Sequence, residues 1–96
     1  MWNRFDIINE LNLSPRKTGV SKGVVRCTYL DPDKVVVYLI DDLNDDSKKF
    51  QFGILSDDGN EVNSLEFKDY TDRENFISRF NEFKKFFTEG GSNEEK

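Results

Sequence analysis

VVRCTYLDPDKVVVYLI, residues 24–40, decides the fold of this 96-residue chain. Residues 24–30 and 34–40 are rich in β-branched and aromatic side chains, which favour the pleated, packed surface of a β-sheet. Between them, Asp31-Pro32-Asp33 fits a type I turn, because Asp suits the first corner and Pro presets φ at the second. We therefore predict a β-hairpin at the centre of the molecule.

Two further strands are predicted after this hairpin. Residues 50–55 (FQFGIL) begin with an alternation of apolar and polar side chains, and Leu65 and Phe67 alternate with Glu66 and a lysine over residues 65–68. Asp58-Gly59 between these two segments is a strong hairpin signal. The link at residues 41–49 (DDLNDDSKK) is long for a hairpin, and we expect it to be mobile.

The N-terminal segment predicts a short helix followed by a loop. Trp2, Phe5, Ile8 and Leu11 recur at every third position with polar residues between them, which indicates an amphipathic helix. The helix should end before Ser14-Pro15, because proline disfavours the helical conformation in the preceding residue. Residues 14–22 (SPRKTGVSK) contain Gly, Pro and Ser punctuation and three basic side chains, so we predict a loop there.

A second helix is predicted near the C-terminus, where residues 76–87 read FISRFNEFKKFF. At 100° per residue, one stripe of this helix carries four phenylalanines, Phe76, Phe80, Phe83 and Phe87. Such a stripe is what a helix needs to lie across a sheet. Thr71 or Asp72 should cap its N-terminus. Phe86 falls off the stripe, and we hypothesise that it contacts a partner or the second copy of a homodimer.

The predicted fold class is therefore α+β: a four-stranded antiparallel meander flanked by an N-terminal and a C-terminal helix, in the order α-β-β-β-β-α. Residues 1–88 should form a single domain. Residues 89–96 should form a disordered acidic tail, since Gly91 and Ser92 break a helix and nothing apolar follows them.

Composition restricts the class of protein. The net charge is −5, but residues 1–30 carry five basic against two acidic side chains, and residues 31–74 carry five basic against thirteen acidic ones. The single cysteine favours a reducing compartment, and no apolar run approaches the length of a membrane span, so we expect a soluble cytoplasmic protein. Alanine and histidine are absent while Asn, Lys, Asp and Phe abound, a bias typical of AT-rich genomes such as those of many phages.

The residues that most enzyme mechanisms need are absent from this sequence. We therefore predict no catalytic residues, no cofactor and no metal site. Without histidine there is neither a Ser-His-Asp nor a Cys-His arrangement, and Cys27 is expected to be a small buried hydrophobe. No EF-hand loop is present. A remote alternative is a metal-dependent nuclease using Pro32-Asp33 and Glu66-Phe67-Lys68, but Asp/Glu-x-Lys triplets occur four times in this acidic chain.

We predict instead a small acidic module that binds proteins without catalysis, acting as a modulator or inhibitor of a larger protein. Clustered carboxylates can occupy a groove built for phosphates, so the partner should have a basic surface and could itself bind nucleic acid. The predicted binding residues are the aspartates of two loops, Asp41, Asp42, Asp45, Asp46, Asp57 and Asp58.

The alternative prediction is a single-stranded nucleic-acid-binding module. Secondary candidate residues for this function are basic: Arg16, Lys17, Lys22 and Arg26. Tyr29 and Tyr38 would provide stacking surfaces. In layout alone, the predicted meander closed by a helix resembles Pur-type single-strand-binding repeats, and α-β-β-β-α resembles double-stranded-RNA-binding domains, which implies nucleic-acid binding.

Overall fold

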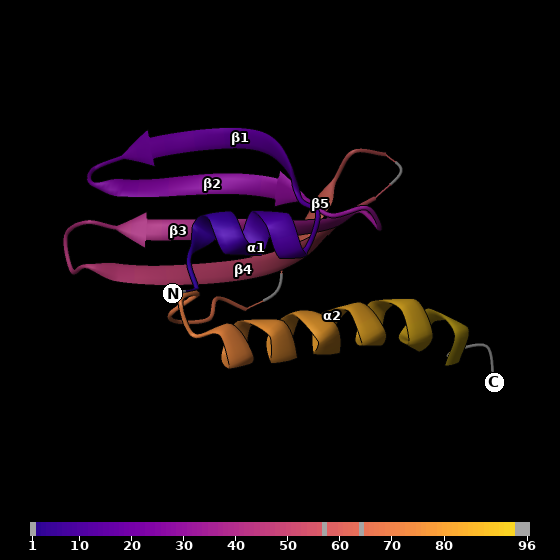
Figure 1. Cartoon of the computed structure of the whole chain (residues 1–96). Helices are drawn as coiled ribbons and strands as arrows, with labels where there is room; N and C mark the ends of the chain where they lie inside the picture. The colour runs from indigo at the N-terminus through magenta and orange to yellow at the C-terminus, as the bar shows by residue number, and fades with distance from the viewer. Residues whose placement is uncertain (1, 57, 64, 94–96) are drawn as a thin grey trace.

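The computed structural model describes residues 2–56, 58–63 and 65–93, which form two helices and one five-stranded sheet (Figure 1). In chain order the elements are α1 (Arg4–Glu10), β1 (Ser14–Ser21), β2 (Val24–Leu30), β3 (Val35–Asp42), β4 (Ser47–Leu55), β5 (Glu61–Asn63) and α2 (Arg73–Asn93). The strands lie in the order β1-β2-β3-β4-β5, each antiparallel to its neighbour. The predicted fold class is confirmed, and the sheet has one strand more than predicted.

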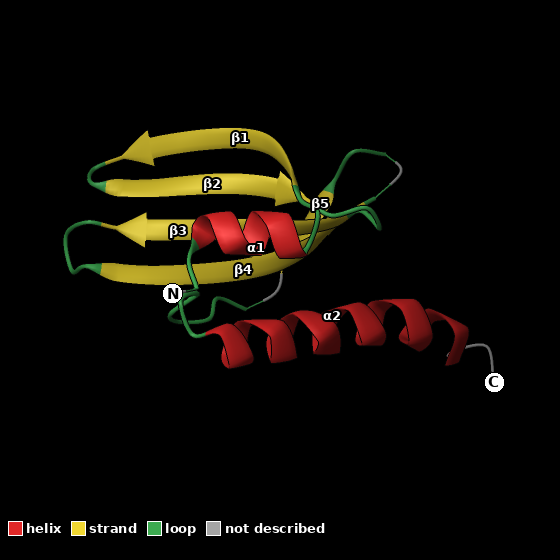
Figure 2. Cartoon of the chain, viewed as in Figure 1, coloured by secondary structure: helices red, strands yellow, loops and turns green. Residues whose placement is uncertain are grey.

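Both helices cover the same face of the sheet (Figure 2). Val35, Val37 and Leu39 of β3 belong to one core cluster with Ile7 of α1 and with two phenylalanines of α2. The alternate residues of β3, at positions 36, 38 and 40, point the other way and form a separate cluster that contains no helix residue. The sheet therefore has a helix face and an open face.

β1 corrects the prediction of a loop at residues 14–22. Lys22 and Gly23 adopt positive φ angles of 51° and 82°, as a two-residue type I′ turn requires, and Ser21 pairs with Val24 across that turn. All eight residues of β1 are exposed, so the strand has no apolar alternation that could reveal it in the sequence. Pro15 is tolerated because β1 is an edge strand, where a bulge follows it.

The predicted mobile link at residues 41–49 is instead a tight hairpin. Asp42 at the end of β3 pairs with Ser47 at the start of β4, which leaves a four-residue turn, Leu43–Asp46. The fourth predicted strand, at residues 65–68, is also misplaced. β5 forms earlier in the chain, at Glu61–Asn63, and Phe67 makes only an isolated bridge to Phe50.

The other predicted turns are confirmed. The Lys34 N–H donates to the Asp31 carbonyl at 3.1 Å across the β2–β3 turn. The buried Asp31 carboxylate accepts hydrogen bonds from the backbone N–H groups of Asp33 and Val35. Gly59, with a φ of 88°, turns the chain between β4 and β5.

The helix α1 forms, and three of the four predicted apolar residues, Trp2, Ile8 and Leu11, pack against the core. Asn3 caps it in a capping box with Asp6. Ile7 is fully buried, whereas Phe5 is 72% exposed. The face that packs follows the i, i+3, i+4 spacing of a helix, and a strict three-residue repeat drifts off that face.

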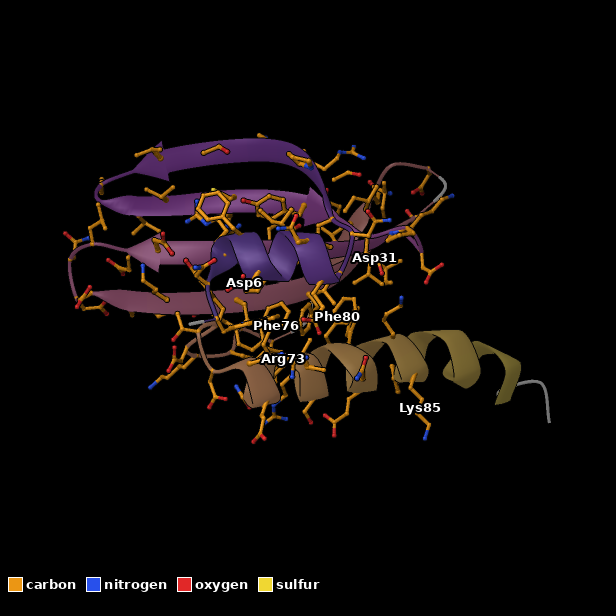
Figure 3. All side chains as sticks on the ribbon, viewed as in Figure 1. Asp6, Asp31, Arg73, Phe76, Phe80 and Lys85 are labelled. Atoms are coloured by element: carbon orange, nitrogen blue, oxygen red, sulfur yellow. The ribbon has the colours of Figure 1, made fainter. Side chains whose placement is uncertain are left out.

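The helix α2 packs through the predicted phenylalanine stripe, and Asp72 caps it as predicted, accepting from the Asn75 N–H at 3.1 Å. Phe76 and Phe80 are buried and point toward the sheet, whereas Lys85 points away from it (Figure 3). The helix continues past the expected break at Gly91 and Ser92 and ends at Asn93. Residues 94–96 of the predicted tail and the side chain of Phe87, the fourth phenylalanine of the stripe, are not among those that the structure describes.

Candidate functional site

The acidic β3–β4 hairpin holds four of the six predicted binding aspartates, but one of them, Asp41, forms hydrogen bonds with other parts of the same chain. Its carboxylate accepts from the Arg4 guanidinium at 2.5 Å and from the Tyr70 hydroxyl at 2.5 Å. The Lys48 ammonium lies 3.7 Å away. Asp41 therefore joins α1 and the segment before α2 to the sheet, and its charge is largely compensated.

The other hairpin aspartates are Asp42, Asp45 and Asp46, and the last two lie beside basic side chains. Asp42 and Asp45 each accept a hydrogen bond from a backbone N–H two residues ahead, those of Asn44 and Ser47. Asp45 and Asp46 line a shallow depression of about 520 Å³, whose wall also contains Lys48, Lys49 and Lys68. The surface is thus of mixed charge and not a dense acidic patch.

The remaining predicted aspartates lie on the β4–β5 turn, at the other end of the sheet from the β3–β4 hairpin (Figure 1). Asp57 lies outside the described residues. Asp58 accepts hydrogen bonds from the Ser56 hydroxyl and from the Asn60 N–H, and these bonds lower the pKa of its carboxyl. The structure therefore does not bring the two acidic loops together.

The open face of the sheet carries a groove of about 600 Å³. Its floor is apolar and comes from three strands: Leu30 of β2, Val36 of β3 and Leu55 of β4. Val36 is only 2% exposed although no helix covers it, because long side chains of the neighbouring strands lean over it. A concave, partly apolar surface with polar walls is the usual form of a binding site.

Three of the four secondary candidates line this groove: Arg16 and Lys17 on β1 and Arg26 on β2. The Arg26 guanidinium lies 5.2 Å from the centre of the Tyr38 ring and donates to the Gln51 side chain at 3.4 Å. All three basic side chains are exposed. On its β1–β2 side the groove is therefore bordered by positive charge, and Glu61 of β5 also lines it. Lys22, the fourth candidate, lies in the β1–β2 turn outside the groove lining.

Tyr38 occupies the middle of the groove but offers little ring surface. It is 5% exposed, and its hydroxyl donates to the carboxylate of Glu61 on β5. Burial and this hydrogen bond raise the pKa of Tyr38 to about 12. Tyr29, the other predicted stacking residue, is buried on the helix face. Glu61 was not singled out in the sequence, where nothing marks it as a neighbour of Tyr38.

Cys27 is buried on the helix face, as predicted. Its sulfur lies 3.6 Å from the Arg4 guanidinium and 3.8 Å from the Thr18 hydroxyl. Phe86 of α2 is 75% exposed, which leaves it open for the predicted contact with a partner.

The residues of the nuclease pattern are separated. Asp33, in the β2–β3 turn, pairs with the Lys84 ammonium at 2.7 Å. Glu66 lies 3.9 Å from Lys49, near the opposite end of β4. Within residues 2–56, 58–63 and 65–93, no three carboxylate or thiol groups lie close enough to hold a metal ion together. In those same ranges, neither helix is both long and apolar enough to cross a membrane.

No protein family model matches the chain, and neither a curated protein nor a solved structure matches it.

Proposed function

We propose that the chain is a non-enzymatic protein-binding module that modulates a larger protein, and that it binds an extended, acidic segment of that partner on the open sheet face. The observation that carries this proposal is the groove, whose β1–β2 side carries Arg16, Lys17 and Arg26 beside an apolar floor. The carboxylate of Glu61 also lines the groove and is hydrogen-bonded to Tyr38. Arginine binds carboxylates through charge-assisted, often bidentate, hydrogen bonds. An apolar floor favours a peptide, whose alternate side chains can supply both charge and hydrophobic contact.

The acidic hairpin remains a second surface, one for a partner with a basic surface. Asp42, Asp45 and Asp46 are the charges available there, since Asp41 is paired internally. If this surface steers a basic partner, changing these three aspartates to Asn should slow its association and flatten the salt dependence. An unchanged association rate across low and moderate salt would exclude this surface.

The second candidate function is single-stranded nucleic-acid binding on the same groove. It is favoured by the convergence of three basic side chains, which would hold phosphates as well as carboxylates. Such modules gain much of their affinity by stacking bases on exposed aromatic rings. Tyr38 lies under Arg26 and Tyr29 is buried on the other face, so the groove provides no such platform. The protein partner is therefore preferred.

Binding of two defined probes separates these functions. The probes are an alternating valine–glutamate octapeptide and an oligothymidylate of about eight nucleotides, measured by fluorescence anisotropy between about 50 and 200 mM salt. The peptide should bind more tightly than the oligonucleotide. The double variant Lys17→Ala/Arg26→Ala should weaken peptide binding about tenfold or more.

The matched control is Lys68→Ala/Lys85→Ala, which removes two exposed charges outside the groove lining. It should leave peptide affinity almost unchanged. Equal losses in both double variants would mean that only bulk charge matters. Tighter binding of the oligonucleotide would replace the proposed function by the second candidate.

A further inference from the structure

The outer edge of β1 is open, whereas the outer edge of β4 is paired with β5 and with the segment that follows it. Among the described residues, β1 pairs only with β2, and its eight residues are all exposed. On the other side, Phe50 of β4 exchanges backbone hydrogen bonds with Phe67, and the Tyr70 N–H donates to the Lys48 carbonyl. An open strand edge is a template onto which another extended chain can pair.

The β1–β2 turn sets which backbone groups of β1 face outward. In a type I′ turn the residues on either side form a hydrogen-bonded pair, here Ser21 and Val24. Hydrogen-bonded and non-hydrogen-bonded residues alternate along an antiparallel pair. Thr18 and Val20 therefore direct their N–H and C=O groups away from β2, toward the open edge.

Gly19 lies between these two residues, and nothing within the chain requires a glycine there. Its φ is not in the left-handed region, and a Cβ placed on it would meet no atom within 4 Å. Glycine inside a strand weakens the strand and often marks a place where a ligand or another backbone approaches closely. Gly19 pairs with Arg26 and lines the same groove, so no Cβ at this position separates the open edge from the Arg26 position on β2.

We propose that the acidic partner segment adds to β1 as a further antiparallel strand, and that a carboxylate on the residue opposite Gly19 passes over this glycine to bind Arg26. The inference rests on the proposed function and specifies its geometry. The added backbone would lie about 10 Å from that of β2, two strand spacings away. The Arg26 side chain would turn from Tyr38 and Gln51 toward β1, and together with a glutamate side chain it would bridge this distance.

Charge on β1 selects this occupant over a second copy of the chain. Arg16 and Lys17 lie on the edge strand beside a bulge at Pro15, and two copies paired through β1 would bring these like charges together. Basic side chains and bulges on an edge are known devices against self-association. The same charges attract an acidic strand.

The decisive variant is Gly19→Val, tested with the valine–glutamate octapeptide. Because the site is open, the variant should fold, and its melting temperature should be unchanged or higher, since β-branched residues favour strands. Its methyl groups would fill the gap, so affinity should fall about tenfold. Ser21→Val is the control: it adds bulk to the same face of β1 beside Val24 instead of Arg26, and should change affinity less than about twofold.

Hydrogen exchange supplies a second readout in the intact protein. The amides of Thr18 and Val20 should exchange rapidly in the free protein and become protected when the octapeptide binds. Octapeptide binding that depends on Lys17 and Arg26, but is normal in Gly19→Val and leaves both amides unprotected, would overturn strand addition and leave the proposed function standing. No binding of the octapeptide up to about 1 mM would overturn both.

Discussion

Asp41 connects three parts of the chain through one carboxylate. Asp41 is part of β3, and it accepts hydrogen bonds from Arg4, the first residue of α1, and from Tyr70, which lies before α2. Its side chain is only 16% exposed. Removing one partner of such a shielded pair leaves the other poorly compensated, which costs more than the pair contributes when intact.

Asp41→Asn should therefore lower the free energy of unfolding by about 1–3 kcal/mol. Asp45→Asn, four residues along the same hairpin, should leave it nearly unchanged, because that side chain is exposed. Urea unfolding of the two variants measures the difference. Equal, small effects would show that the Arg4–Asp41–Tyr70 contacts contribute little to stability.

Tyrosine ionisation provides a second test at the residue scale. Burial, together with hydrogen bonds to Glu61 and Asp41 respectively, raises the pKa values of Tyr38 and Tyr70 to about 12. The folded state therefore holds these protons more tightly than the unfolded state, whose tyrosines ionise near pH 10. The resulting stability is complete below about pH 10 and is lost as the pH rises through about 12.

A spectrophotometric titration should show no phenolate from these two residues at pH 10 in the folded protein, and Tyr70→Phe should make the alkaline loss of stability less steep. Tyr38→Phe makes the same test for the tyrosine on the open face. A full phenolate signal near pH 10 from the still-folded protein would contradict the buried hydrogen bonds.

At the scale of elements, α2 is held by a graded set of phenylalanines. Phe76 is fully buried and contacts Phe50 with ring centroids 4.7 Å apart. Phe83 is half-buried at 5.6 Å from Phe52, and Phe86 is 75% exposed. The stability of the helix on the sheet should follow this order.

Phe76→Ala should cost about 3–5 kcal/mol, a large fraction of the total stability of a small domain. Phe83→Ala should cost less, and Phe86→Ala least of all. Chemical denaturation measures the free energy of unfolding of each variant, provided that the m-value is the same in all of them. Similar, small losses at all three positions would show that α2 does not pack as described.

The contrast between α2 and β1 shows which elements could be predicted from the sequence and which could not. The stripe of α2 and the central strands were predictable because burial selects large apolar residues at fixed spacing. β1 was not, since an exposed edge strand has no such pattern and depends on its pairing with β2 and on the turn at Lys22 and Gly23. The predicted face of α1 failed at Phe5 because a three-residue repeat does not match the helical period.

At the scale of the whole molecule, the two helices lie on one face of the sheet and leave the other face open (Figure 2). The basic side chains of the groove were predicted individually as candidates. Their meeting in one groove was not predictable, since it depends on which face of β3 the helices cover and on the register of β1. Acidic residues concentrate in the turns, many of them paired there with backbone N–H groups or lysines.

Amide chemical-shift mapping during titration with the valine–glutamate octapeptide shows whether the open face binds an acidic extended chain. The largest shifts should occur on β1 and β2, at Lys17, Gly19 and Arg26, with smaller shifts at Tyr38. Shifts concentrated instead in the β3–β4 hairpin, or on α2 around Phe86, would contradict it.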